Sequence, residues 1–311
     1  MNSTIGHQYS SAGHAVTIGF FDGVHTGHRY VISQLRQVAS RCGLPSMVVT
    51  FDRHPREVVH SQWQPQFLTT LDEKVQLLRQ AGVDRVEVLH FDHALSQLTA
   101  RDFMDRVLRQ RLGVSVLLIG YDNHFGHRAA GSTEGFADYQ AYGKLLGIDV
   151  VAGQPLVGAE GVAVSSSMVR RLLAQGLVEE AAHALGRHYS ISGTVEHGHE
   201  VGRSMGFPTA NLAVQPRMMV PADGVYAVKV SIDGSDQGLL GVTNIGTRPT
   251  FDPDAHIRTI ETHILDYAAD LYGRRLRLEF IARLRAEQRF PSRQALARQM
   301  ADDIARAKSY L

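Results

Sequence analysis

The chain has 311 residues, of which 44% are hydrophobic and 20% are charged, and its formal net charge is +1. This length and composition suit a globular protein of about two domains, each able to bury a core, and the dispersed Lys and Arg argue against a nucleic-acid or membrane partner. Cys42 is the only cysteine, which excludes an intrachain disulfide; we expect a cytoplasmic protein, because residues 1–15 lack the features of a secretory signal and no apolar run approaches a membrane span.

Residues 1–185 alternate β-rich runs with helical patterns. Strands are expected at 15–20, 46–51, 86–91, 115–120 and 148–152. Helices are expected at 27–42, 72–81, 100–112, 133–146 and 167–175. This alternation is typical of α/β proteins, in which helices cover both faces of a parallel sheet. The Ala-rich stretch GLVEEAAHALG predicts one more short helix before a domain boundary at 185/186.

Residues 186–311 follow a different pattern, with short runs rich in Val, Ile and Tyr between Gly, Pro, Asn and Asp clusters. Strands are expected at 189–197, 224–232, 238–246, 258–265 and 275–284. This pattern predicts an antiparallel sheet or small β-barrel. A terminal helix is expected after Ser292, a candidate N-cap, because the following apolar residues have helical spacing.

The stretch GFFDGVHTGHRY, from Gly19 to Tyr30, lies between the first expected strand and the first expected helix. Open α/β sheets bind ligands at the carboxyl ends of their strands, and a helix beginning near Gly27 would aim free N–H groups at that crevice. His25 and His28 flank the first turn and can donate to phosphate oxygens. The stretch therefore predicts a phosphate site, although a zinc pair and two structural histidines remain open. A dinucleotide fold is disfavoured because the chain has no G-x-G, and it has no P-loop either.

A second candidate phosphate segment is SSSMVRRLLAQG, from Ser165 to Gly176. Serine hydroxyls, helix N–H groups and the guanidinium of Arg170 can together bind phosphate. The alternative is an ordinary N-cap followed by a solvated basic face. The pairing with H-x-G-H in one α/β half favours the phosphate interpretation.

The stretch GRSMGFPTANL combines a loop of spaced glycines with two oxygen donors. Thr209 and Asn211 alternate along an extended segment, so both side chains can face one site. A hydroxyl and an amide carbonyl suit Mg²⁺, which keeps waters and binds phosphates. The alternative is a turn in which both side chains bond to nearby backbone.

The run IETHIL places Glu261 in an otherwise apolar, β-prone segment. Alternation predicts that Glu261 and His263 share one face, opposite Ile260, Thr262 and Ile264. Taken alone, Glu261 is as well explained by a solvent-facing position on a half-exposed strand.

Four motifs of the first half, GFFDGVHTGH, TFDRHPREV, GYDNHFGHRAAG and SSSMVRRLL, occur in an order that resembles bacterial bifunctional riboflavin kinase/FAD synthetases. The resemblance implies that residues 1–185 form a Rossmann-like FMN adenylyltransferase domain. It places His25, His28 and Arg170 among the catalytic residues. It implies ATP or phosphate contacts for Gly19, Phe20, Asp22, Gly23, Gly27, Ser165 and Ser166. It implies flavin contacts for His54, Asp122 and Phe125.

The second half resembles riboflavin kinase domains through GFPTAN, ADGVYAV, GVTNIGTRPTF, IETHILD and DLYG, so the resemblance spans roughly residues 15–310. It implies that residues 186–311 form a small β-barrel with a terminal helix. Thr209 and Asn211 correspond to Mg²⁺ ligands, and Glu261 corresponds to the catalytic glutamate. The loop over the ATP phosphates contains Gly198, Gly202 and Gly206.

The chemistry of the two reactions agrees with this division. The riboflavin hydroxyl is a neutral alcohol, so a carboxylate that accepts its proton is useful in the kinase step. The FMN phosphate is mostly dianionic, since its second pKa is about 6. The adenylyl-transfer step therefore needs alignment and charge stabilisation, but no general base.

We therefore expect a bifunctional enzyme that phosphorylates riboflavin to FMN with MgATP and adenylates FMN to FAD. Three alternatives remain. In the first, the chain retains one activity and the other half has decayed through loop changes such as Arg53 or Asn123; the chain also departs from the family at Ser132. In the second, the protein binds flavin without turnover. In the third, it is linked to nucleic acid, since some tRNA synthetases carry H-x-G-H. The intact motif residues argue against the second alternative, and the near-neutral charge argues against the third.

Overall fold

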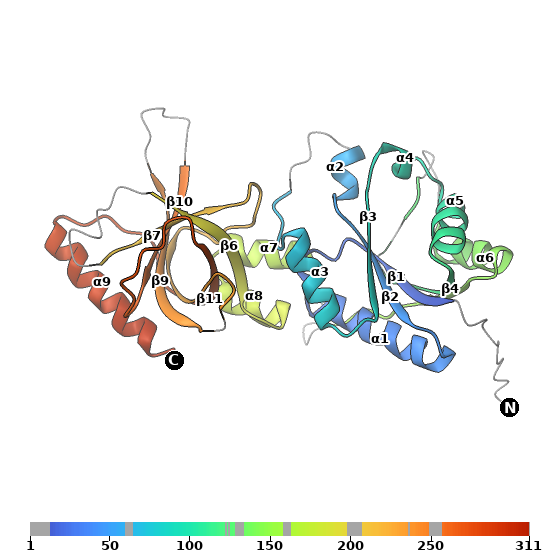
Figure 1. Ribbon diagram of the computed structural model, residues 1–311, viewed down its shortest axis with the longest axis horizontal. Helices are drawn as coiled ribbons and strands as arrows, with labels where there is room; N and C mark the ends of the chain where they lie inside the picture. Colours follow the sequence, from blue (N-terminus) through green and yellow to red (C-terminus); the bar gives the residue numbers. More distant parts are fainter. Residues whose placement is uncertain are drawn as a thin grey trace. The chain divides into compact units, whose positions relative to one another are not determined.

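The computed structural model describes residues 13–59, 65–121, 123, 125–127, 134–157, 163–197, 207–235, 237–248 and 257–310. The chain divides into two compact units, one reaching Pro65 and resuming from Thr69 to Ser165, the other made of Gln66–Leu68 and the chain from Ser166 onward (Figure 1). Helices α7 (Ser166–Ala174) and α8 (Val178–Leu185) thus belong to the second unit, because α8 packs against two of its strands. The domain boundary expected at 185/186 from the sequence stays a prediction.

The first unit contains a five-stranded parallel sheet in the order β3-β2-β1-β4-β5, which confirms the expected α/β fold. Its strands are β1 (His14–Ile18), β2 (Ser46–Phe51), β3 (Arg85–Leu89), β4 (Val114–Ile119) and β5 (Asp149–Ala152). The strand order reverses between β1 and β4. In open α/β sheets, the carboxyl ends of the strands at such a point form the usual ligand crevice.

Helices cover both faces of this sheet (Figure 1). The α-helices of this unit are α1 (Thr26–Cys42), α2 (Pro55–Val59), α3 (Leu71–Gln80), α4 (His93–Ser96), α5 (Ala100–Asp102) and α6 (Phe136–Leu146). The α1 and α3 side chains pack on one face, against Ala15 and Val48. On the other face, Val16 and Ile18 pack against α6 and a π-helix, Phe103–Arg111, which stands where the sequence predicts a continuous α-helix over 100–112.

The second unit is a closed antiparallel barrel with strand order β10-β7-β6-β11-β8-β9, which confirms the expected small barrel. Its strands are β6 (Tyr189–Glu196), β7 (Ala210–Val214), β8 (Gly224–Ile232), β9 (Leu239–Arg248), β10 (Ile257–Ile264) and β11 (Arg275–Arg285). Strand β7 is not among the strands expected from the sequence, because its five residues include no long β-branched run. It closes the barrel between β6 and β10.

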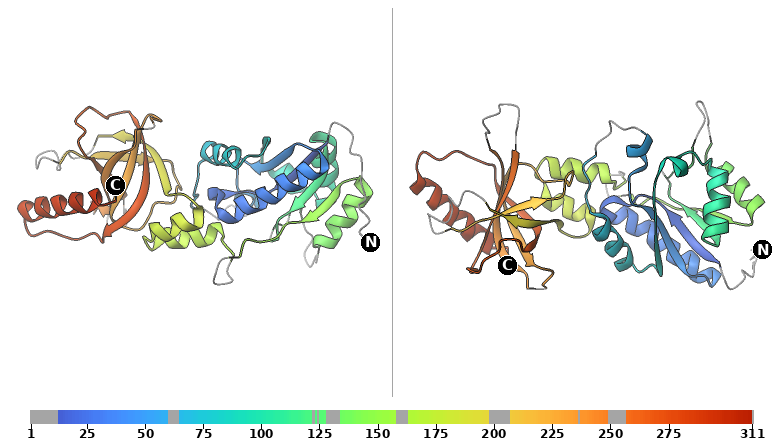
Figure 2. Two further views of the ribbon diagram at one scale, coloured as in Figure 1. Left: turned by 90° about the horizontal axis from the view of Figure 1, so that it is seen from below. Right: turned by 45° about the horizontal axis from the view of Figure 1, so that its top comes forward.

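The terminal helix α9 (Arg293–Lys308) lies against the outside of the barrel (Figure 2). Its N-cap is Ser292, whose hydroxyl accepts the Ala295 N–H at 3.2 Å, as the sequence predicts. The barrel interior is filled by large side chains such as Tyr189, Tyr226 and Phe280, which are fully buried.

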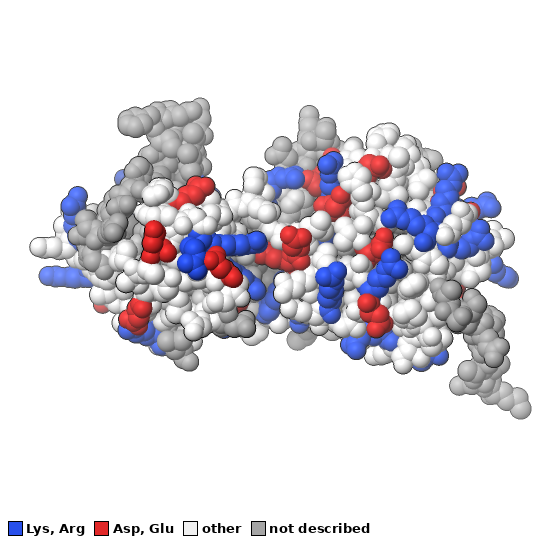
Figure 3. Space-filling model, viewed as in Figure 1, with Lys and Arg blue, Asp and Glu red and all other residues white. Residues whose placement is uncertain are grey.

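Charged side chains of both signs are interspersed on the face drawn in Figure 3. Around the π-helix the arginines have acidic partners: Arg109 pairs with Asp105, and Arg85 and Arg111 share Glu87. Such exposed pairs contribute little stability but balance the local charge.

Candidate active sites

The turn that follows β1 has a strained backbone. Phe21 and Val24 have positive φ values of 55° and 41°, a region that non-glycine residues rarely occupy, and Gly23 has φ 79°. The turn is held by buried hydrogen bonds, since Thr69 donates to the carboxylate of Asp22 at 3.2 Å and its hydroxyl accepts the Gly23 N–H at 3.2 Å. The Asp22 side chain therefore supports the turn at the carboxyl end of β1.

His25 and His28 lie together at the start of α1. Their rings are stacked with centroids 3.6 Å apart, and Nδ1 of His25 accepts the His28 N–H at 3.3 Å, which caps the helix. A neutral His25 with this bond carries its proton on Nε2 and can donate from there. In the described part of the chain, the buried Nδ1 of His28 has no hydrogen-bond partner.

His28 is held in its neutral form. Burial lowers the pKa of its imidazole well below 6.5, and electrostatic interactions with His25 and Lys74 lower this pKa further. At neutral pH the ring therefore offers one N–H donor and one acceptor nitrogen, without a full positive charge.

Gly27 is closely packed at the first turn of α1. A Cβ at this position would lie 3.0 Å from the carbonyl oxygen of Val164 and 3.1 Å from the ring of His25. The residue after Val164 is Ser165, so the start of the second predicted phosphate segment approaches H-x-G-H within the first unit. Ser166 belongs to the second unit, together with Arg170, whose Nε donates to the carbonyl of Gln66 at 2.6 Å.

Phe20 and His54 meet at the carboxyl ends of β1 and β2, with ring centroids 4.5 Å apart. The Phe20 carbonyl accepts from the hydroxyl of Thr50 at 3.0 Å. Lys74, a residue that the motif search missed, lies over the Phe20 ring and is buried. A signal was present, because Lys74 occupies the apolar face of α3, three residues after Leu71 and four before Leu78.

The expected flavin segment near Phe125 is only partly described. The Phe125 ring stacks on Tyr139 with centroids 4.6 Å apart, so its inner face belongs to the core. The amide of Asn123 donates to the carbonyl of Ile18, the last residue of β1. The side chain of Arg53 is exposed. Asp122 and Ser132 lie outside the described residues, and so do the loop glycines Gly198, Gly202 and Gly206 of the second half.

In the barrel, Glu261 lies between two asparagines. The strand registers place Asn211 of β7 and Asn244 of β9 directly opposite Glu261 of β10. Directly opposite residues project on the same face, so these three polar side chains are neighbours. The buried side chains of Ile260, Thr262 and Ile264 alternate with Glu261, as the sequence predicts.

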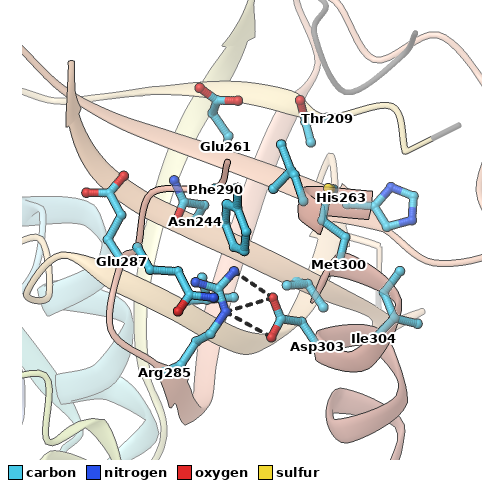
Figure 4. Close-up of a pocket in the computed structure, with 14 residues that line it drawn as sticks. Thr209, Asn244, Glu261, His263, Arg285, Glu287, Phe290, Met300, Asp303 and Ile304 are labelled. Carbon is cyan, nitrogen blue, oxygen red and sulfur yellow. Dashed lines mark hydrogen bonds and ion pairs between the residues drawn. The ribbon is translucent and has the colours of Figure 1, made fainter. Parts of the chain in front are cut away.

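A cavity of about 280 Å³ lies between this face of the barrel and α9 (Figure 4). It is lined by Thr209, Val225, Val242, Asn244, Glu261, His263, Arg285, Glu287, Gln288, Phe290, Leu296, Met300, Asp303 and Ile304. Asn244, Glu261 and His263 come from the barrel strands, whereas the apolar Leu296, Met300 and Ile304 come from the helix. A site with convergent polar groups and an apolar wall is typical of small-molecule binding. Asn244 was not selected from the sequence, although it lies within the motif GVTNIGTRPTF.

An ion pair attaches α9 to the barrel beside this cavity. Nε of Arg285 donates to both carboxylate oxygens of Asp303 at 3.1 Å, and Nη2 donates to one of them at 2.8 Å (Figure 4). Gln299 also donates to Asp303 at 3.1 Å. The Asp303 side chain is 2% exposed, so removal of either partner would leave a poorly solvated charge.

The donor set around Glu261 fits Mg²⁺ better than a transition metal. Thr209 contributes a hydroxyl to the cavity, and Asn211 contributes an amide oxygen beside Glu261. Among the described residues, no three His, Cys, Asp or Glu side chains are placed to hold a metal ion. Hard oxygen donors with few protein charges are typical of Mg²⁺ that also binds water and phosphate.

Comparison with known proteins accounts for both halves of the chain. The FAD synthetase family model matches residues 7–168, and the riboflavin kinase model matches residues 185–311. A bifunctional riboflavin kinase/FMN adenylyltransferase of Pseudomonas fluorescens is 43% identical over 305 residues, which cover 96% of this chain and 93% of the relative. The chain belongs to the bifunctional riboflavin kinase/FMN adenylyltransferase family. The resemblance noted in the motifs is thereby confirmed.

Two further proteins are similar to this chain over nearly its full length. The bifunctional riboflavin kinase/FMN adenylyltransferase of Escherichia coli K12 is 40% identical over 308 residues, covering 98% of this chain and 96% of the relative. A solved structure described as a macrolide-efflux protein from Streptococcus pneumoniae is 28% identical, with a TM-score of 0.85 over 96% of this chain and 95% of that one. Within the described residues of this family member, no helix is long and apolar enough to cross a membrane.

Proposed function

We propose that this chain makes FAD from riboflavin in two ATP-dependent steps. The barrel phosphorylates riboflavin to FMN, and the parallel-sheet unit adenylates FMN with release of pyrophosphate. The observation that carries this proposal is the presence of two separate polar sites, one in each unit, in a chain whose two halves match the two families. A reducing cytoplasm stays the expected compartment, since Cys42 is the only cysteine.

In the kinase step, Glu261 accepts the proton of the riboflavin hydroxyl as that oxygen attacks the γ-phosphate of ATP. The support is its position on the cavity wall, with Asn211 and Asn244 directly opposite it on the two neighbouring strands. A bound Mg²⁺, held by Thr209 and Asn211, would neutralise phosphate charge. The cavity wall formed by α9 would exclude water from the transferred phosphoryl group.

In the adenylyl-transfer step, the chain aligns two anions and stabilises charge on the α-phosphate. The α1 N-terminus supplies N–H groups, and His25 stands at this N-terminus, where its Nδ1 accepts the His28 N–H. His28 is neutral, so its contribution is a directed N–H donor without a full charge. Ser165 belongs to this site in our proposal, and His54 and Phe125 contact the flavin.

The test supplies the purified chain with riboflavin and MgATP and separates the flavin products. We expect FMN followed by FAD. His28→Ala should stop FAD formation while FMN accumulates, because the kinase residues are untouched. Glu261→Ala should block FMN formation but still convert supplied FMN to FAD.

Other outcomes would contradict the proposal in different ways. Formation of FMN without FAD by the unaltered chain would leave a kinase alone. A folded variant in which either substitution abolishes both reactions would show that the two sites are not separate. No turnover of either flavin would remove the enzymatic proposal.

A further inference from the structure

Lys74 is a buried cation at the ligand-binding edge of the sheet, and the steps above do not use it. Its exposed fraction is 3%. The ammonium group donates to the carbonyl of Phe51, the last residue of β2, at 2.8 Å. It also lies 3.9 Å from the centre of the Phe20 ring. Lysine is rarely buried this deeply without a functional or structural reason.

These contacts make the position of Phe20 depend on Lys74. One face of the Phe20 ring receives the ammonium, a favourable cation–π arrangement whose strength increases when water is excluded. His54 packs against the same ring, and Thr50 holds the Phe20 carbonyl. Phe20 is the second residue of the GFFDGVH turn, so Lys74 supports the turn that leads to the two histidines.

The charge of Lys74 also acts on the phosphate site. Burial lowers its pKa to about 8, although Asp22 of the turn and Asp52 after β2 oppose this shift. The group is therefore mostly protonated at pH 7, and this charge is one cause of the lowered pKa of His28. Because the interior screens charge poorly, a buried ammonium raises the potential at nearby anion sites more than a surface lysine does.

We propose that Lys74 is a positioning residue for FAD synthesis, whose ammonium fixes Phe20 and favours binding of the ATP and FMN phosphates at the H-x-G-H turn. This inference rests on the proposed adenylyltransferase function of the first unit. Lys74 acts by holding Phe20 in place and through the electrostatic potential of its ammonium group, and it transfers no proton.

The test compares Lys74→Met, which removes the charge but keeps the length, with Lys74→Arg, which keeps the charge. We expect Lys74→Met to lower kcat/KM for conversion of FMN to FAD on the order of tenfold to a hundredfold. Lys74→Arg should recover part of this loss. The riboflavin kinase activity of the same chains should stay unchanged, and the thermal unfolding described below reports whether the first unit is folded. Lys144→Met, which removes an exposed lysine of α6, is the matched control and should leave both activities unchanged.

The pH profile separates a charge effect from a packing effect. The ammonium group of Lys74 loses its proton as pH rises through about 8, so kcat/KM for FAD synthesis should fall in that range in the unaltered chain. Neither His28 nor Asp52, which both interact with Lys74 electrostatically, titrates in that range. The pKa of His28 is lowered well below 6.5; burial raises that of Asp52, but hydrogen bonds from His90 and the Phe91 N–H outweigh burial and leave it below 3.8. Arginine stays protonated at this pH, so Lys74→Arg should lose this alkaline decline.

Thermal unfolding at pH 7 gives an independent readout. Burial of the charged form opposes folding, so the first unit of Lys74→Met should unfold at the same or a higher temperature. Normal FAD synthesis by Lys74→Met, or an unchanged alkaline decline in Lys74→Arg, would overturn the inference while the proposed function stands. If Lys74→Met does not fold, the Lys74→Arg profile decides alone. An unaltered chain that makes no FAD would overturn the adenylyltransferase proposal itself.

Discussion

At the scale of single residues, the two sites differ in the kind of polar group they present. Glu261 is a carboxylate on a strand face, flanked by asparagines, and suits proton acceptance from an alcohol. The first site presents His25 and a neutral His28 at a helix start, and suits binding of an anion that needs no base. Sequence reasoning chose the histidines for phosphate over metal on chemical grounds. The stacked rings and the orphaned Nδ1 of His28 add the geometry.

Substitution of Gly27 by alanine tests how tightly the H-x-G-H turn is packed. The new methyl group would press on the Val164 carbonyl, which is backbone, and on the His25 ring. We expect the first unit to lose about 1–2 kcal/mol of unfolding free energy, and kcat for FAD synthesis to fall about tenfold or more. Denaturant unfolding and FMN-to-FAD kinetics measure both effects.

The control for this substitution is Gln37→Ala, which alters an exposed position of the same helix. Gln37→Ala should change neither the unfolding free energy nor kcat for FAD synthesis, and riboflavin phosphorylation should be normal in both variants. Full FAD-synthesis activity in Gly27→Ala would mean that the turn accommodates the methyl group, contrary to the packing described above.

At the scale of elements, α9 is the part of the second unit that converts a barrel face into a cavity. The helix begins at a sequence-predictable N-cap, Ser292, but its docking depends on the bidentate contact of Arg285 with Asp303. Arg285 is at the end of β11 and Asp303 is in the third turn of the helix. Their separation in the chain hides this pairing from any local pattern.

Asp303→Ala should loosen α9 and impair the kinase alone. Loss of the carboxylate leaves the guanidinium of Arg285, which is 17% exposed, without its partner, and we expect a cost of about 3 kcal/mol in unfolding free energy. KM for riboflavin should rise, because Met300 and Ile304 of α9 form one wall of the cavity. Steady-state kinetics and denaturant unfolding check these effects.

Asp302→Ala provides the matched control, since Asp302 is exposed on the same helix. Its kinetics and stability should equal those of the unaltered chain. An Asp303→Ala variant with unchanged riboflavin KM would show that the cavity beneath α9 does not bind the flavin.

At the scale of the whole molecule, the two units carry different sets of polar groups. The proposed kinase residues Thr209, Asn211 and Glu261 all lie in the second unit, and H-x-G-H lies in the first. The product of one site is the substrate of the other, and FMN is a diffusible molecule. The two steps therefore need not occur on one chain.

Mixing two inactive chains tests this separation. His28→Ala supplies FMN and Glu261→Ala converts it, so an equimolar mixture should make FAD from riboflavin although neither variant does so alone. Product separation over time measures the recovery, which should show a lag while FMN accumulates. A mixture that makes FMN but never FAD would show that FMN reaches the second site only within its own chain.

The sequence alone predicted the two fold classes and most of the longer helices and strands. Hydrophobic periodicity indicates which face of an element is buried, and turn residues mark where the element ends. The bounds of the parallel-sheet strands and of the terminal helix were therefore predicted to within about two residues. The predicted alternation of Glu261 with buried neighbours also follows from a local period. Strand β7 and the π-helix were missed, because tertiary pairing and packing decided them.

Only the tertiary structure decided which distant residues meet. It placed Asn244 opposite Glu261, brought Val164 against Gly27, joined Arg285 to Asp303 and buried Lys74 beneath Phe20. These pairings depend on strand register and on side-chain packing between elements far apart in the chain. Local sequence patterns report which face of an element is buried, but the partner on that face is determined by the fold as a whole.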